Sequence, residues 1–233
     1  MRIVAFIPAR GGSKGVRRKN LRSIGPFSLL SLKIAQAKKS KCDEIFVSTE
    51  DDEIAKVAKL SGAEVISRPM ELAQDDTSTD AVLLHAIQAI GLKESDYLVL
   101  LQATSPFLES SKINECIDSL LNSQGDSSAI TIRYGHPFMW KQVGAQIDPS
   151  GHTRNKRPRR QDLGVEGWET GGCYAILVGA LMKQGVRYPA PTLGVGVNQL
   201  EALDIDTVDD LEMAQEIFEA LAISNKLKDI SGD

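Results

Sequence analysis

Residues 3–15 of the chain read IVAFIPARGGSKG, and the rest of the sequence is interpreted outward from this stretch. Its first five residues are apolar and form a run of strand length that stops at Pro8. Three glycines and two cations lie among residues 9–15. A buried strand that leads into a glycine-rich, basic loop is typical of an open parallel sheet, where ligands bind beyond the carboxyl ends of the strands.

The loop itself predicts phosphate binding. Gly11, Gly12 and Gly15 allow the backbone to approach a ligand closely and to point N–H groups at anions. Positive charge comes from Arg10, Lys14, Arg17, Arg18 and Lys19. The spacing matches neither the Walker A motif nor the Gly-x-Gly-x-x-Gly dinucleotide motif, so ATPase and dehydrogenase functions are disfavoured. Composition alone leaves open a simple turn with solvated cations.

Beyond this loop, short apolar strands alternate with amphipathic helices. The pattern predicts helices at residues 29–39, 51–60, 79–90 and 111–121, and strands at residues 44–48, 64–67, 97–101 and 129–133. A last strand at residues 172–178 precedes residues 200–205, and Thr207 is expected to cap a helix that runs to about residue 221. This alternation predicts an α/β fold, a Rossmann-like doubly wound, mostly parallel sheet with helices on both faces.

The alternation breaks between residues 134 and 168, where Pro, Gly and cations dominate. We expect this segment to leave the core as a loop or hairpin arm. It carries the large apolar residues Phe138, Met139 and Trp140, which would form an apolar patch prone to association if they were exposed. The length of 233 residues suits one domain, residues 1–233, with the arm inserted in it.

Composition excludes several classes of protein. The net charge of −4 argues against a dedicated nucleic-acid binder. No apolar run approaches the roughly 20 residues that cross a bilayer, and no signal peptide is recognised, so we expect a cytoplasmic protein that does not bind membranes. Cys42, Cys116 and Cys173 are too few and too far apart for a disulfide framework or a zinc site, and we expect buried thiols.

Several stretches, in their usual order, resemble the acylneuraminate cytidylyltransferases and related enzymes that activate other keto-sugar acids. They are IPARGGSKG (7–15) with KNL (19–21), VSTED (47–51), RP (68–69) with ELA (71–73), LQATSP (101–106), RQD (160–162) and LDIDT (203–207). The resemblance covers nearly the whole chain. It implies attack of the anomeric hydroxyl of a 2-keto sugar acid on the α-phosphorus of CTP, which yields a CMP-sugar and pyrophosphate.

The resemblance also implies where CTP would bind. The matching nucleotide-binding positions are Ala9, Arg10, Gly12, Ser13, Lys19, Asn20, Arg68 and Thr79. A triphosphate carries about four negative charges, and the guanidinium of arginine suits phosphate oxygens. We therefore expect Arg10 and Lys19 to act in catalysis by neutralising charge. Arg68, which precedes Pro69, has an alternative interpretation as a surface arginine at the end of a strand.

Asp204 and Asp206 are separated by one residue, so an extended chain places both carboxylates on one face. Their mutual repulsion calls for a positive charge. Hard oxygen ligands beside a triphosphate suit Mg²⁺, with Mn²⁺ as an alternative. We expect the two acids to be metal ligands and catalytic residues. The alternative is that Asp206 belongs to the start of the helix at Thr207 and that Asp204 is merely exposed.

For the acceptor, Gln102 follows the most apolar strand, where a glutamine has no packing role, and the resemblance implies that it contacts the sugar. Thr104 and Ser105 could simply cap a helix. The resemblance makes the arm a homodimerisation element that reaches the partner's active site, where Arg160 would meet the sugar carboxylate beside Gln161.

The acceptor itself stays open. Many relatives have Asn-Gly before the late strand, whereas this chain has Thr170-Gly171. Sialic, legionaminic and pseudaminic acids, or an eight-carbon keto-sugar acid of the KDO type, all remain candidates. The other functional alternatives are a nucleotidyltransferase with a non-sugar acceptor and a nucleotide-binding module that has lost catalysis.

Overall fold

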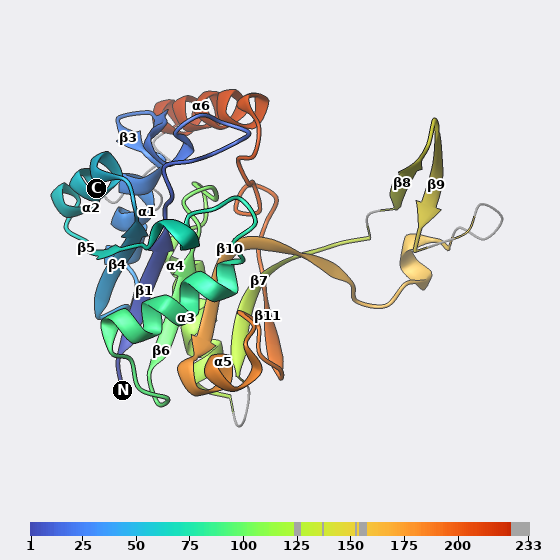
Figure 1. Cartoon of the computed structure of the whole chain (residues 1–233). Coiled ribbons are helices and arrows are strands. Elements are labelled where there is room, and N and C mark those ends of the chain that lie inside the picture. Colours follow the sequence, from blue (N-terminus) through green and yellow to red (C-terminus); the bar gives the residue numbers. More distant parts are fainter. Residues whose placement is uncertain (124–126, 137, 152, 154–157, 225–233) are drawn as a thin grey trace.

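The computed structural model describes residues 1–123, 127–136, 138–151, 153 and 158–224. Within them a seven-stranded sheet runs in the order β11-β7-β10-β6-β1-β4-β5 (Figure 1). The strands are β1 (Ile3–Pro8), β4 (Glu44–Thr49), β5 (Glu64–Ser67), β6 (Tyr97–Leu101), β7 (Ser128–Tyr134), β10 (Gly167–Leu177) and β11 (Thr192–Gly196). β1 pairs in parallel with β4 and β6, β4 with β5, and β7 with β11, whereas β10 runs antiparallel to β6 and β7. The predicted mostly parallel sheet is confirmed.

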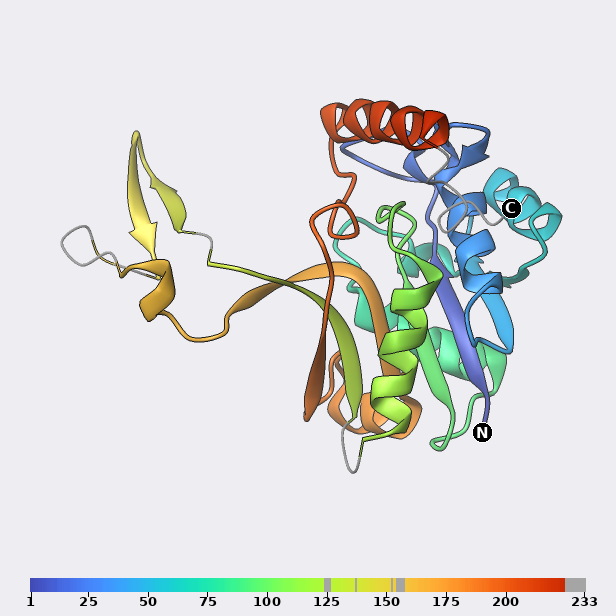
Figure 2. The ribbon, with the colours of Figure 1, turned by 180° about the vertical axis from the view of Figure 1, so that it is seen from behind.

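Helices cover both faces of the sheet, because successive side chains of a strand point to opposite sides. Ala5 and Ile7 of β1 share a core with α1 (Leu29–Lys38), α2 (Asp52–Leu60) and α4 (Ser110–Leu121). Val4 and Phe6 face α3 (Thr79–Ile90) and α5 (Val178–Gln184). Figure 1 shows α3 and α5 in front of the sheet, and Figure 2 shows α4 on the opposite side. The doubly wound arrangement is confirmed.

The last helix, α6 (Val208–Ile223), lies across the end of the sheet to which β1 runs (Figures 1 and 2). Its buried residues Leu211 and Phe218 pack against Ile24 of the short hairpin β2 (Ser23–Ile24) and β3 (Phe27–Ser28). Thr207 caps the helix as predicted, since its side chain accepts a hydrogen bond from the N–H of Asp210 at 3.2 Å. The cap anchors residues 204–206 directly before it.

Several sequence predictions need correction. α5 and β11 were not expected, and β10 spans Gly167–Leu177 where residues 172–178 were predicted. Thr104 and Ser105 do not cap a helix, because α4 begins only at Ser110 with Glu109 as its N-cap. The carbonyl groups of Ser105 and Pro106 instead accept hydrogen bonds from side chains of α1, which hold this segment in turns.

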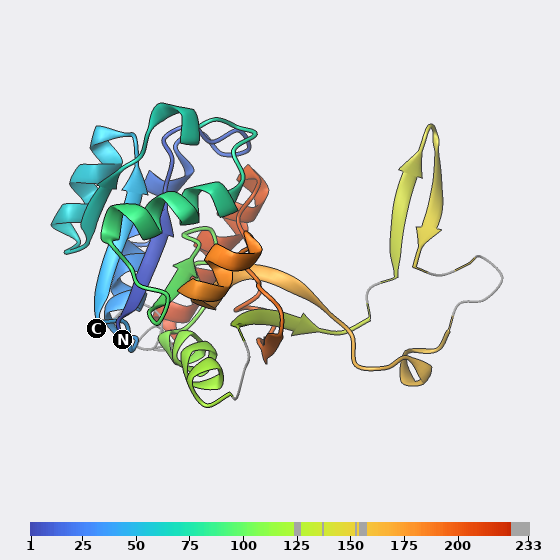
Figure 3. The ribbon, with the colours of Figure 1, turned by 60° about the horizontal axis from the view of Figure 1, so that its bottom comes forward.

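Residues between β7 and β10 project away from the sheet (Figures 1 and 3). They carry the antiparallel hairpin of β8 (Met139–Val143) and β9 (Gln146–Ser150) and the short 3-10 helix η3 (Arg160–Asp162). The predicted excursion of residues 134–168, called the arm below, is therefore present. Cys42, Cys116 and Cys173 are free, and the latter two are buried. Among the described residues, no helix has the length and apolar character that would span a membrane.

Candidate functional site

A cleft of about 410 Å³ lies beyond the carboxyl ends of the parallel strands β1, β5 and β6. Its lining is mostly polar and comes from distant parts of the chain: Pro8, Arg10, Ser13, Lys14, Gly15, Lys19, Asn20, Arg68, Leu72, Gln74, Asp75, Thr77, Thr79, Val82, Gln102, Thr104 and Asp206. The cleft therefore brings together eight of the predicted nucleotide, acceptor and catalytic side chains, which are Arg10, Ser13, Lys19, Asn20, Arg68, Thr79, Gln102 and Asp206. Parallel strands explain the convergence, because their carboxyl ends meet at one edge.

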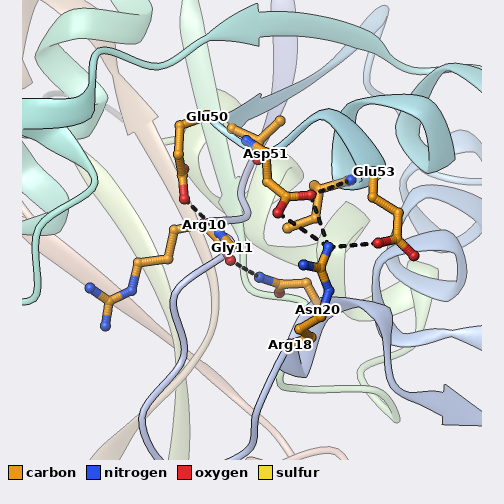
Figure 4. A network of polar contacts seen from close by, with 9 residues as sticks. Arg10, Gly11, Arg18, Asn20, Glu50, Asp51 and Glu53 are labelled. Atoms are coloured by element: carbon orange, nitrogen blue, oxygen red, sulfur yellow. Dashed lines mark hydrogen bonds and ion pairs between the residues drawn. The ribbon is translucent and has the colours of Figure 1, made fainter.

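Polar contacts from neighbouring segments hold the glycine-rich loop (residues 9–18) in place (Figure 4). The N–H of Gly11 donates to Glu50 Oε1 at 2.7 Å, and Asn20 Nδ2 donates to the carbonyl of Arg10 at 3.0 Å. Arg18 pairs with Asp51, the N-cap of α2. In Figure 4 the guanidinium of Arg10 points away from this network. These contacts hold the backbone of the loop in place without use of the Arg10 side chain.

Acidic groups already neutralise the cations of this loop. Arg10 Nη1 lies 2.9 Å from Asp75 Oδ1 and donates to the carbonyl of Gln74 at 3.0 Å. Lys14 Nζ lies 2.8 Å from Asp75 Oδ2. The hydrogen bond from Lys14 is the main cause that lowers the pKa of Asp75. Asp75 therefore pairs with the two cations that a triphosphate would bind. The sequence pattern did not predict this role of Asp75.

Lys19 joins the loop to the other end of the chain. It belongs to the short 3-10 helix η1 (Lys19–Leu21), and its Nζ donates to the carbonyl of Ile205 at 2.6 Å and to Asp206 Oδ1 at 3.0 Å. Gly15 packs directly on this segment, since a β-carbon there would overlap the carbonyl oxygen of Asp206. The loop and residues 204–206, called the acid segment below, therefore form one side of the cleft.

Within the acid segment, Ile205 is fully buried and its two acidic neighbours are exposed, as expected for an extended chain. Asp206 lines the cleft, whereas Asp204 lies just outside its lining and is hydrogen bonded to the Thr104 side chain. Although the residue is exposed overall, desolvation of its carboxyl group raises the pKa of Asp204. The Thr104 hydrogen bond lowers that pKa, and the charge of Asp206 raises it further.

Arg68 is a buried arginine and not a surface one, so the alternative interpretation is wrong. Its Nε donates to Ser48 Oγ at 3.1 Å and its Nη2 donates to the Ser48 carbonyl at 2.8 Å. Burial lowers its pKa to about 10, while the nearby Glu50 acts in the opposite direction. At neutral pH the side chain is therefore a fixed cation in the wall of the cleft.

The structure does not bring every predicted residue to the cleft. Ala9 is buried with its N–H bonded to the Ser48 carbonyl at 3.0 Å, and Gly12 is exposed outside the lining. Arg160 and Gln161 lie in η3 of the arm, which projects away from the sheet (Figure 1), and neither residue lines the cleft of the same chain. Part of the basic run of the arm, residues 154–157, lies outside the described residues.

Other residues of the site were not predicted from the sequence. Glu50, Gln74, Thr77 and Thr104 hold the loop or line the cleft. Glu50 belongs to the stretch VSTED (47–51), which resembles the cytidylyltransferases, and this resemblance is the signal that could have identified it. Thr170 shares a hydrogen bond of 2.7 Å with Thr131 inside the sheet. Its hydroxyl therefore helps to hold the irregular register between β10 and β7.

Comparisons with known proteins point to one family. A family model described as cytidylyltransferase matches residues 4–147. N-acylneuraminate cytidylyltransferase B of Danio rerio is 38% identical over 176 residues, which is 73% of this chain and 40% of that protein. N-acylneuraminate cytidylyltransferase A of the same organism is 34% identical over 220 residues, which is 92% of this chain and 50% of that protein. This chain therefore spans half or less of the length of these two relatives.

A relative of similar length is the pseudaminic acid cytidylyltransferase of Campylobacter jejuni, which is 26% identical over 227 residues, 94% of this chain and 97% of that protein. Among solved structures, a CMP:2-keto-3-deoxy-manno-octonic acid synthetase complexed with CTP aligns with a TM-score of 0.68 at 15% identity, over 96% of this chain and 100% of that chain. At this identity the likeness shows a shared fold.

Proposed function

The chain belongs to the cytidylyltransferase family, and we propose that it transfers CMP from CTP to the anomeric hydroxyl of a nonulosonic, sialic acid-like 2-keto sugar acid, with release of pyrophosphate. One observation carries the proposal. A single cleft contains Arg10 and Lys19, an acidic side chain of the acid segment, and Gln102 at the end of the central strand β6. These groups suit a triphosphate at one side and a polar acceptor at the other.

In the proposed reaction, the anomeric oxygen forms a bond to the α-phosphorus while the bond from that phosphorus to the α,β-bridging oxygen breaks. Pyrophosphate leaves with that oxygen, and the hydroxyl proton passes to water or to a carboxylate of the acid segment. The protein supplies position and charge. Arg10 and Lys19 would hold the triphosphate and neutralise the charge that develops on the departing pyrophosphate. Lys19 is oriented for this by the Ile205 carbonyl. Arg68 and Thr79 would line the cytidine side.

We propose that Asp204 and Asp206 hold Mg²⁺, or Mn²⁺ in its place. The residues fit such an ion, because their like charges lie close enough for Asp206 to raise the pKa of Asp204, and a cation would relieve that repulsion. Among the described residues, no group of three or more His, Cys, Asp or Glu gathers as for a metal. Phosphate oxygens and water would complete the ligand set, as is usual for Mg²⁺. The bound ion would supply further charge neutralisation.

The acceptor class rests on the named relatives, which act on N-acylneuraminate and pseudaminic acid. Gln102 would contact the acceptor inside the cleft. An acidic acceptor also gives a role to Arg160 and Gln161 of the arm, because a guanidinium binds a carboxylate with two parallel hydrogen bonds. Since these residues lie away from the cleft of their own chain, we propose that they act on the cleft of a partner in a homodimer.

The arm has the surface that such a dimer requires. Met139 is 58% and Val143 50% exposed on one face of the hairpin, and Trp140 is 46% and Ile147 57% exposed on the other. Large apolar side chains exposed on a projecting hairpin mark an interaction site. The three free cysteines suit a reducing compartment, and we propose that the enzyme works in the cytoplasm.

The test of the reaction is incubation of the protein with each nucleoside triphosphate, Mg²⁺ and a panel of acids, followed by measurement of pyrophosphate and identification of the product by mass. The panel contains sialic, legionaminic and pseudaminic acids, an eight-carbon keto-sugar acid and a neutral hexose. We expect strong preference for CTP and for an acidic sugar. Equal turnover with GTP, or equal use of the neutral hexose, would contradict the proposal.

The test of the shared site is complementation. A chain with Arg160→Ala keeps its own acids, and a chain with Asp206→Ala keeps its own arm. If Arg160 acts on the partner's cleft, mixing the two inactive variants restores part of the activity in mixed dimers. Failure of the mixture to recover activity, or a monomer at micromolar concentration, would contradict the arrangement.

A further inference from the structure

Lys33, in the middle of α1, is fully buried. Lysine is almost never fully buried unless it is paired, because removal of an ammonium from water is costly. Among the described residues Lys33 forms no ion pair with a carboxylate. Its Nζ donates instead to the carbonyl oxygen of Ser105 at 2.9 Å. Desolvation lowers the pKa of Lys33 to about 7, and the nearby Cys173 acts in the opposite direction.

The segment that Lys33 contacts carries part of the cleft. Residues 102–109 join β6 to α4 through turns without regular structure. α1 contacts this segment a second time, one turn after Lys33, where Gln36 Nε2 donates to the Pro106 carbonyl at 2.7 Å. Ser110 Oγ donates back to the Gln36 carbonyl at 2.8 Å. One buried face of α1 therefore holds the backbone of this segment.

From Ser105, hydrogen bonds lead to both sides of the cleft. The N–H of Ser105 donates to the Gln102 carbonyl at 3.3 Å. The carbonyl of the adjacent Thr104 accepts from the N–H of Ile205 at 2.9 Å, and the Thr104 side chain is hydrogen bonded to Asp204. The position of Ser105 thus determines where the acceptor side and the acid segment meet.

We propose that Lys33 is a positioning residue of the active site. Its buried amine holds the Ser105 carbonyl and thereby fixes Gln102 relative to the acid segment. An apolar residue would be expected at a fully buried helix position on grounds of stability, and departures from that rule are expected where function requires them. The inference rests on the proposed function, because it concerns the precise placement of groups that would bind the acceptor and the metal.

The test compares Lys33→Met with the parent. Methionine is unbranched, flexible and apolar, so it fills the space of the lysine stem and removes the amine. The control is Lys41→Met, which removes an exposed lysine that pairs with Asp118. We expect Lys33→Met to lower kcat/KM for the acceptor about tenfold, by misplacement of the reacting groups. Because Arg10 and Lys19 are untouched, the Kd for CTP should change by less than about twofold. Lys41→Met should match the parent in both.

Hydrogen exchange supplies a readout that does not depend on turnover. The N–H of Ile205 is bonded to Thr104, so its exchange in Lys33→Met should be about tenfold faster than in the parent. If the parent transfers CMP to no acid, the proposed function is wrong. The role of Lys33 is then tested only by the hydrogen-exchange rate of the Ile205 N–H in Lys33→Met and in the parent. If Lys33→Met keeps both the parental acceptor kinetics and the parental exchange rate, Lys33 is not a positioning residue.

Thermal melting shows whether the variant retains its fold. The folded pKa of Lys33, about 7, lies below the ordinary value of 10.5, so between these pH values unfolding takes up a proton. The parent therefore loses stability relative to Lys33→Met as pH falls from 10.5 to 7, and the difference in Tm is constant below 7. If Lys33→Met does not fold, Lys33→Gln replaces it in both assays. If neither variant folds, the lysine serves folding and the proposal is wrong.

Discussion

The glycine-rich loop and the arm look alike in the sequence, since both are rich in glycine or proline and in cations, yet they are built differently. The loop is held by other parts of the domain, with Glu50 bonded to Gly11 and Asp51 bonded to Arg18. Contacts in the arm, such as Arg159 with Asp162, join residues of the arm to one another. Most of β8 and β9 is exposed.

The two regions therefore differ in the contacts that hold them in place. The loop is complete within one chain, so a change there should act on that chain's own cleft. The arm presents apolar side chains that its own domain leaves exposed, so a change there should act between chains. Substitutions can therefore separate the two regions by their effects on turnover and on assembly.

The largest expected effect is at the acid segment. Asp204→Asn and Asp206→Asn should each lower turnover by about 10²–10³-fold through lost charge stabilisation. Both should stay folded with a Tm close to the parent's in the absence of metal, because relief of the mutual repulsion offsets lost hydrogen bonds. Pyrophosphate release and thermal melting measure the two effects. Normal turnover of both variants with Mg²⁺ would place the metal site elsewhere.

The next effect concerns the contact between the loop and the acid segment. Gly15→Ala should lower turnover by up to about a hundredfold, because its β-carbon would push the loop away from the Asp206 carbonyl. Gly164→Ala is the matched control in the arm, where a β-carbon meets nothing within 4 Å. Steady-state kinetics with CTP compare the two. If both variants keep parental turnover, the close packing at Gly15 is unimportant.

A smaller effect is expected on assembly. Val143→Asp places a charge on the hairpin face that Val143 shares with Met139 and should weaken the homodimer about tenfold or more, as loss of a buried interface contact does. Leu60→Asp is the control, because Leu60 is 79% exposed on α2, outside the arm. Sedimentation at several protein concentrations measures both. Equal dimerisation of the two variants would show that this face of the hairpin is not the interface.

The smallest effect is expected at Asp75, whose ion pairs with Arg10 and Lys14 must break before phosphate oxygens can reach these cations. Exposed ion pairs contribute little, so Asp75→Asn should lower the Kd for CTP only about two- to fivefold. Added salt should shrink the difference. Asp76→Asn, the exposed neighbour, is the control for calorimetric titration with CTP. Weaker binding by Asp75→Asn would mean that the carboxylate helps to hold the nucleotide.

Local patterns in the sequence were sufficient for most of the fold. The apolar run of β1, the periodicity of α3 and the cap at Thr207 depend on neighbouring residues, and each was predicted where the structure has it. β11 (TLGVG) was missed because two glycines in five residues are typical of a loop. It forms a strand because β7 offers a parallel edge with free backbone groups, which is a property of the sheet.

In the candidate site, too, some features follow from local sequence and others only from tertiary packing. The sequence by itself determined the chemistry of the cleft, because glycines and cations directly after a strand suit phosphate wherever the strand lies. Only the tertiary structure decided that Asp75 pairs with the loop cations, that Lys33 is buried under Ser105 and that Arg160 lies away from its own cleft. Such contacts join residues far apart in the chain, and they follow from the packing of whole elements, which no local pattern of residues encodes.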